Sequence, residues 1–168
     1  SDELKADKEV VLAAVQNYSK ALEYSSDELK NDKEVVMAAI EEDARALEYS
    51  SDELKADKEV VLAAVQNYGH ALEHASDELK ANKEVVLAAV SNADAGYALQ
   101  YASDELKADK EVVMAAVKND DSSGHSHCLE YASDELKADK EVVMAAVNNG
   151  GGYALQYASD ELKADKEV

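Results

Sequence analysis

The densest group of side chains able to do chemistry lies in the stretch KNDDSSGHSHC, residues 118–128. Carboxylates, imidazoles and thiolates are the ligands that zinc and related metals take in proteins. The candidate ligands are Asp120, Asp121, His125, His127 and Cys128. A neighbouring His and Cys can also form a thiol nucleophile, but only with an activating geometry and an oxyanion site. Either chemistry depends on the elements that hold this stretch in place.

The rest of the chain shows that this stretch is one variant of a repeated segment. The motif SDELK recurs with its Ser at 1, 26, 51, 76, 103, 133 and 159. All extra residues fall at one point of the unit, between VxxAAV and ALxYA, which predicts a loop there. Cys128 aligns with Ala in the other units, and His127 aligns with Lys, Arg, His or Tyr. The sequence therefore predicts a polar loop with a small buried Cys, and no metal site.

No other motif indicates catalysis or a cofactor. The P-loop, GxGxxG and HExxH patterns are absent from the sequence. Carboxylate pairs are frequent, but they recur as SDE and DKE in every unit, which is typical of a solvated face. We therefore expect a protein that is not an enzyme, without cofactors. The sequon NYS makes Asn17 a candidate glycosylation site if the protein is secreted.

The charge balance also excludes classes of partner. The net charge is −20, from 37 acidic and 17 basic residues. Binding to nucleic acid or to anionic membranes requires clustered Lys and Arg, so neither is expected. No apolar run is long enough to span a bilayer, and the single Cys excludes an intrachain disulfide. The compartment stays open, and it would be extracellular if the protein forms a fibre.

Each unit contains two segments with helical character. In the first unit, residues 7–17 (DKEVVLAAVQN) begin with Asp7 as an N-cap, followed by Glu9 in the first turn. Val10–Val15 are apolar at every position, which predicts a helix buried on several sides. A buried strand is the alternative, but the Ala pair disfavours it. The second segment, residues 21–31, is either one helix or two short turns with Ser26 as an N-cap.

Helices of about ten residues are marginal alone in water, so each unit must pack against its neighbours. The sequence predicts an all-α fold: a right-handed α-solenoid of about six two-helix repeats of 25–30 residues. Residues 1–168 would form a single array, uncapped at both ends, since the first and last units match the interior ones. We expect this array to be a segment of a longer one.

Equivalent positions should then form columns along the array. One Leu column contains Leu4, Leu29, Leu54, Leu79, Leu106, Leu136 and Leu162, and a second contains Leu22, Leu47, Leu72, Leu99, Leu129 and Leu155. A third column contains Tyr24, Tyr49, His74, Tyr101, Tyr131 and Tyr157. We interpret the Tyr column as stacked packing with the hydroxyls near water, in preference to a ligand-binding strip.

Two segments carry a resemblance to a known family: LKADKEVVLAAVQNYGHALEHAS (54–76) and YALQYASDELKADKEV (153–168). Their pattern resembles the repeat of domain-of-unknown-function family 4116, and it extends over essentially the whole chain. The resemblance implies helical solenoid units within longer multi-repeat proteins, without an assigned activity. The chain departs from the pattern by insertions at 93–97, 120–127 and 150–153.

These observations favour a structural or scaffold role in which units stack head-to-tail, as part of a rod or helical fibre. The expected partner is further copies of the same array. The alternative is a protein-binding solenoid that presents its loops or a concave face to another protein.

Overall fold

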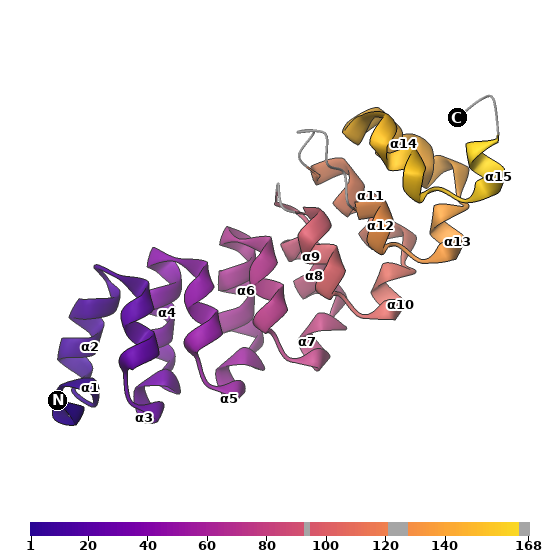
Figure 1. Cartoon of the computed structure of the whole chain (residues 1–168). Coiled ribbons are helices and arrows are strands. Elements are labelled where there is room, and N and C mark those ends of the chain that lie inside the picture. Colours follow the sequence, from indigo (N-terminus) through magenta and orange to yellow (C-terminus); the bar gives the residue numbers. More distant parts are fainter. Residues whose placement is uncertain (93–94, 121–127, 165–168) are drawn as a thin grey trace.

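The computed structural model describes residues 1–92, 95–120 and 128–164, and within these residues it is entirely helical, without strands. The helices form an elongated stack with the two termini at opposite ends (Figure 1). We number the repeats by their initial Ser: repeat 1 is 1–25, repeat 2 is 26–50, repeat 3 is 51–75, repeat 4 is 76–102, repeat 5 is 103–132 and repeat 6 is 133–158.

Each repeat contributes to three rows of helices. The short row holds the DELK helices: α1 (Asp2–Lys5), α3 (Asp27–Lys30), α5 (Asp52–Lys55), α7 (Asp77–Lys80), α10 (Asp104–Lys107), α13 (Asp134–Lys137) and α15 (Asp160–Lys163). The long row holds α2 (Lys8–Val15), α4 (Lys33–Glu42), α6 (Lys58–Asn67), α8 (Lys83–Ala89), α11 (Lys110–Asn119) and α14 (Lys140–Gly150). The linking row holds the 3₁₀ helices η1 (Ser19–Tyr24), η2 (Ala44–Tyr49), η3 (Gly69–His74) and η4 (Gly151–Tyr157), and the α-helices α9 (Ala95–Tyr101) and α12 (Cys128–Tyr131).

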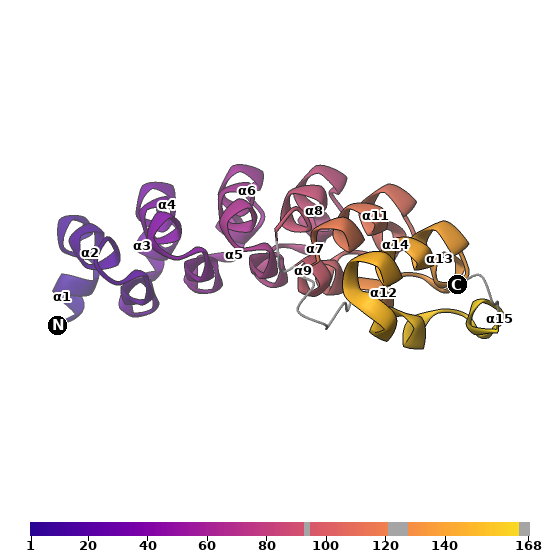
Figure 2. The ribbon, with the colours of Figure 1, turned by 90° about the horizontal axis from the view of Figure 1, so that it is seen from above.

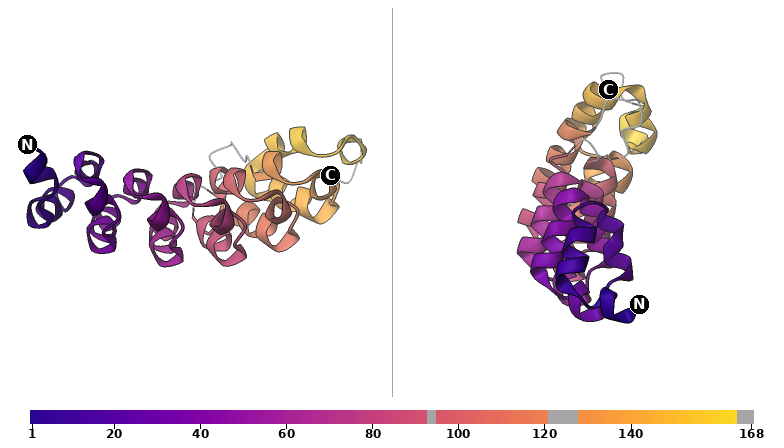
Figure 3. Two further views of the ribbon diagram at one scale, coloured as in Figure 1. Left: turned by 90° about the horizontal axis from the view of Figure 1, so that it is seen from below. Right: turned by 90° about the vertical axis from the view of Figure 1, so that its left-hand side faces the viewer.

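The long and short rows lie on opposite sides of the stack. Seen from above, the long helices lie along one side and the short helices along the other (Figure 2). Two further views show that successive repeats are offset from one another, so the stack is not a straight column (Figure 3). The expectation of an all-α protein built from repeated units is confirmed.

Side-chain caps explain where the helices begin. The Asp7 carboxylate accepts hydrogen bonds from the amides of Glu9 and Val10, so Asp7 is the N-cap of α2 as expected. Ser26 caps α3, and its hydroxyl oxygen accepts a bond from the amide of Leu29. A cap satisfies amides that have no partner inside the first turn of a helix.

The second predicted segment forms two elements, so each repeat has three helical pieces where two were expected. Ser25 and Ser26 have extended backbone angles, with ψ of 164° and 158°, which end η1 and start α3. The Ser25 hydroxyl donates to the carbonyl of Leu22, which stabilises this end. The open alternative of two short turns is therefore the correct one.

The core lies between the long and linking rows. Val35, Val36, Ala39 and Ile40 of α4 are buried, as are most of their counterparts in the other long helices. Leu47 of η2 is buried too. The outward-facing Met37 and its counterparts are only half-buried, so the long helices are buried on several sides but not all round. Two rows of neighbours cover most of the circumference of each helix, and the rest faces solvent.

A backbone hydrogen bond joins each short helix to the next. The amide of the initial Ser donates to the carbonyl of the Lys at the end of the preceding DELK helix, at N–O distances of 2.9–3.0 Å. The pairs are Ser26–Lys5, Ser51–Lys30, Ser76–Lys55, Ser103–Lys80, Ser133–Lys107 and Ser159–Lys137. Successive repeats are thus held at a fixed distance in the short row.

Membrane crossing requires a helix of sufficient length and apolar character, and none of the helices in the described residues has both.

Candidate functional site

The most regular polar feature is a ladder of ion pairs that connects successive repeats. The first Lys of a long helix reaches the N-cap Asp of the next long helix, with Nζ–Oδ2 distances of 2.7–2.8 Å. The pairs are Lys8–Asp32, Lys33–Asp57, Lys83–Asp109 and Lys110–Asp139. The same ammonium groups also contact a Glu two residues after the Asp, for example Glu34 and Glu59 at 2.8 Å. Each Asp therefore caps its own helix and binds the previous repeat.

These contacts change the acidity of the groups involved. The hydrogen bond from Lys33 lowers the pKa of the Asp57 carboxyl, against the opposing effect of partial burial. Lys8 lowers the pKa of Asp32 in the same way, and the two carboxylates that Lys8 contacts raise the pKa of its ammonium group. The ladder is thus charged at neutral pH.

The ladder has one irregular step, between repeats 3 and 4. Asn82 stands where the other long helices have a capping Asp, and its side-chain oxygen accepts from the amide of Val85 at 3.3 Å. Lys58 pairs with Glu84 at 2.6 Å. Asn can therefore replace Asp as a cap, although it provides no charge for the Lys.

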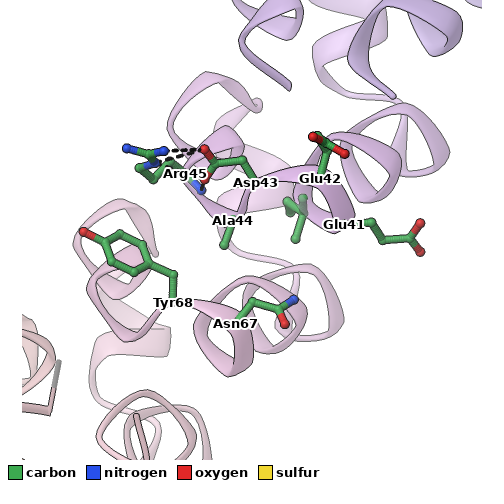
Figure 4. A pocket seen from close by; sticks show the side chains of 8 residues that line it. Glu41, Glu42, Asp43, Ala44, Arg45, Asn67 and Tyr68 are labelled. Carbon is green, nitrogen blue, oxygen red and sulfur yellow. Dashed lines mark hydrogen bonds and ion pairs between the residues drawn. The ribbon is translucent and has the colours of Figure 1, made fainter. Parts of the chain in front are cut away.

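A surface cleft lies where the long row meets the linking row in repeats 2 and 3. It has a volume of ≈ 470 Å³ and is lined by Ile40, Glu41, Glu42, Asp43, Ala44, Arg45, Asn67 and Tyr68. Arg45 is held by Asp43 through two hydrogen bonds from Nε and one from Nη2 (Figure 4). The Tyr68 ring and the Arg45 guanidinium lie at the same side of the cleft in that view. The cleft offers carboxylates, one neutralised guanidinium and an aromatic ring.

An aromatic cluster surrounds His70 at the joint between repeats 3 and 4. Its ring lies 5.1 Å from Tyr101, 5.6 Å from Tyr68 and 6.0 Å from Tyr97, measured between centroids. His70 Nε2 is 3.3 Å from the Tyr101 hydroxyl and 3.1 Å from Oε2 of Glu73. The cluster adjoins a second surface hollow of ≈ 310 Å³ that also contacts Arg45, Glu48 and His74.

The metal candidates fall mostly outside the described residues, and this applies to Asp121, His125 and His127. Asp120 follows α11, and its Oδ2 is buried without a hydrogen-bond partner among the residues that the structure describes. Cys128 begins α12 and is fully buried, as its alignment with Ala predicts. Burial, followed by the negative charge of Asp120, raises the pKa of its thiol. In residues 1–92, 95–120 and 128–164, no three His, Cys, Asp or Glu side chains converge on a metal position.

The other sequence candidates are separate from the clefts. Asn17 is exposed, and its side-chain amide donates to the Ala13 carbonyl at 2.7 Å, which stabilises the end of α2. Glycosylation of Asn17 stays a prediction. Tyr49, Tyr101, Tyr131 and Tyr157 pack half-buried against the core, consistent with the packing interpretation, and burial raises the pKa of each hydroxyl.

Sequence reasoning missed the ladder and the His70 cluster. The sequence analysis assigns the carboxylates of the DKE motif to a solvated face, although a Lys and, in all repeats but the fourth, an Asp recur at a spacing of one repeat, which is a signal for pairing between units. The His70 cluster had no such signal, because its aromatic partners come from variable loop positions.

Comparison with known proteins gives the family. The profile of the family described as "Domain of unknown function (DUF4116)" matches residues 7–55, 57–95, 92–125 and 121–163. The chain belongs to this family. The DUF4116 matches follow one another along the array, and the first spans most of repeats 1 and 2, so the family pattern includes the joint between repeats. A search of curated proteins found no match, and a search of solved structures found none.

Proposed function

We propose that this DUF4116 protein is a non-enzymatic structural element or scaffold whose repeats stack head-to-tail into a rod or helical fibre. In this proposal the array is a single right-handed α-solenoid of about six repeats. The observation that carries the proposal is the recurrent joint, in which one backbone bond of 2.9–3.0 Å returns in each repeat. A joint made in the same way each time gives a regular, extended element.

The charged ladder supports the same role. Its ion pairs run along the stacking direction and connect each repeat only to its neighbours. Stability in such an array is a sum of repeat terms and nearest-neighbour terms. The clefts in repeats 2 and 3 are lined mainly by polar residues that vary between repeats, which are a poor basis for a shared catalytic activity.

Insertion of one more repeat tests the proposal. A second copy of residues 26–50 placed after Ser50 keeps the 25-residue register. We expect the longest dimension, measured by small-angle X-ray scattering, to grow by about one helix spacing of ~10 Å. Urea unfolding should show increased stability. A variant that is no longer than the parent, or that loses helical content, would refute the proposal.

A second candidate function is recognition of a partner protein at the loop edge of repeats 2 to 4. The observation that favours it is the concentration of Arg45, Tyr68 and His70 around two adjoining hollows, since Arg and aromatic residues are enriched in protein interfaces. Affinity capture with the wild type and with Tyr68→Ala tests it, and Tyr18→Ala in repeat 1 is the matched control. Partners that bind all three proteins equally would exclude this surface.

A further inference from the structure

The end of α4 in repeat 2 differs from the corresponding segment of every other repeat. In the other repeats, the second residue after the apolar run is an Asn whose side-chain amide donates to a carbonyl near the end of a long helix, at 2.7–3.1 Å. These residues are Asn17, Asn67, Asn92, Asn119 and Asn149. Repeat 2 has Glu42 at this position, and a carboxylate has no hydrogen atom to donate.

Glu41, the residue before it, is also the one acid among its counterparts, which are Gln, Ser, Lys or Asn. Both carboxylates are exposed at the C-terminal end of α4, where the helix dipole disfavours negative charge. Arg45 is bound by Asp43. Neither Glu41 nor Glu42 forms an ion pair or a side-chain hydrogen bond with any residue that the structure describes. A local cost without a gain for the fold indicates a functional position.

The cleft of repeats 2 and 3 also contains an unused backbone acceptor. The Ile40 carbonyl is equivalent to those of Val65 and Val117, and each of these accepts a bond of 2.8 Å from the Asn of the following repeat. Asn67 donates instead to Ala63 of its own helix. Within the described part of the chain, nothing donates to the Ile40 carbonyl. Ile40 is 1% exposed and lines the cleft, so the cleft is the side from which a donor can approach.

An aromatic ring forms another part of the lining. Tyr68 is half-buried, and in Figure 4 its ring lies on the opposite side of the view from Glu41. Ring faces attract cations, and a planar guanidinium can also stack on them. The cleft therefore combines negative charge, a carbonyl acceptor and an aromatic surface, while the donors of Arg45 and Asn67 are already used.

We propose that this cleft binds an arginine side chain of a partner protein. The guanidinium donates to the Ile40 carbonyl, and its plane packs on the Tyr68 ring. Glu41 and Glu42 supply the opposite charge. A guanidinium has five N–H donors and no acceptor, which suits a cleft rich in acceptors. A Lys ammonium has the same charge but no plane to stack. The proposal rests on the second candidate function above and specifies the chemistry of the partner.

Fluorescence anisotropy with a labelled, Arg-containing peptide in a Gly–Ser background tests the proposal on the full chain. Two matched peptides have Lys or the uncharged citrulline in place of Arg. We expect the dissociation constant of the Arg peptide to be about tenfold lower than that of the Lys peptide. The citrulline peptide should bind most weakly. The net charge of −20 attracts any basic peptide, so equal affinity for the Arg and Lys peptides would overturn the proposal, as would no binding of the Arg peptide.

Two double variants with the same change in net charge locate the site. Glu41→Gln/Glu42→Asn gives repeat 2 the residues of repeat 3, and it should raise the dissociation constant of the Arg peptide about tenfold. Glu28→Gln/Glu53→Gln is the matched control, since both residues are exposed on the short row. It should change the dissociation constant less than about twofold. Equal effects of the two double variants would refute binding in this cleft.

Urea unfolding without peptide gives a second measurement. The midpoint of Glu41→Gln/Glu42→Asn should be higher than that of the wild type, because the helix end regains an amide donor and loses two unfavourable charges. A lower midpoint would mean that the carboxylates stabilise the fold, and it would overturn the proposal. A captured partner that needs Tyr68 but binds this double variant unchanged would refute the arginine site and leave the recognition surface in place.

Discussion

Gly69 shows how closely the linking row approaches the long row in repeat 4. A Cβ atom at Gly69 would lie 2.4 Å from the carbonyl oxygen of Ala89, a backbone atom that cannot rotate away. Ala44 occupies the equivalent position in repeat 2, so an Ala side chain is compatible with the 3₁₀ conformation itself. The requirement for Gly comes from the neighbouring helix.

Gly69→Ala should therefore destabilise the protein by about 1–3 kcal/mol, the usual cost of overpacking. Gly152→Ala is the matched control, since its added Cβ would meet nothing within 4 Å. The free energy of unfolding in urea, followed by circular dichroism, should fall for the first variant and stay nearly unchanged for the second. Equal effects would show that the contact with Ala89 is not the cause.

Cys128 illustrates the difference between a reactive type of residue and a reactive site. Its thiol is fully buried, and burial raises its pKa, which keeps it protonated and unreactive at neutral pH. We expect a thiol reagent to modify Cys128 slowly in the native protein and rapidly in urea. Cys128→Ala should change the stability little, because Ala fills the same slot in the other repeats. Fast labelling of the native protein would contradict this.

At the scale of the helix, the ladder predicts a dependence of stability on pH. The pKa of Asp57 lies below its usual value of 3.8 because Lys33 binds the carboxylate in the folded state. A lowered pKa stabilises the folded state above the unfolded pKa, and the contribution disappears as the pH falls through the folded pKa. Asp57→Asn, which keeps the cap, should be less stable than the wild type at pH 7, and the difference should shrink as the pH falls below 3.8 and through the folded pKa.

The joint between repeats 3 and 4, where Asn82 replaces the capping Asp, allows the opposite experiment, in which a carboxylate is added to the ladder. Asn82→Asp gives Lys58 the carboxylate that its counterparts have, so this variant should be more stable than the wild type at neutral pH. Its advantage should disappear in acid over the same range. Urea midpoints measured at pH 7 and pH 3 for both variants provide the comparison. A pH-independent difference would mean that capping, and not the ion pair, determines the effect.

The helices themselves could be predicted from the sequence, because their signals are local. The Asp7 and Ser26 caps and the apolar run after Asp7 each act within a few residues. The three-piece repeat was harder to predict, since the extended Ser25–Ser26 link resembles a continuous helix in composition. The His70 cluster and the Arg45 cleft could not be predicted, because they join residues of different repeats at positions whose residue type varies from repeat to repeat.

At the scale of the whole molecule, the position of a residue along the stack determines how much its side chain contributes to the free energy of unfolding. Leu72 is fully buried in repeat 3, whereas Leu155 at the same column is only partly buried in repeat 6. Leu72→Ala should cost about 2–5 kcal/mol, as for other buried Leu residues. Leu155→Ala should cost clearly less. Urea unfolding of the two variants measures the difference, and equal losses would mean that neighbouring repeats contribute little to the core.

The Ser–Lys bond between repeats is made by main-chain atoms alone, an amide and a carbonyl that nearly every amino acid possesses. Mutations that accumulate in the side chains over evolutionary time therefore leave this contact intact. Divergent members of such a family can lose recognisable sequence similarity and still keep the same repeat length. The spacing between repeats should therefore be better preserved than the identity of the side chains.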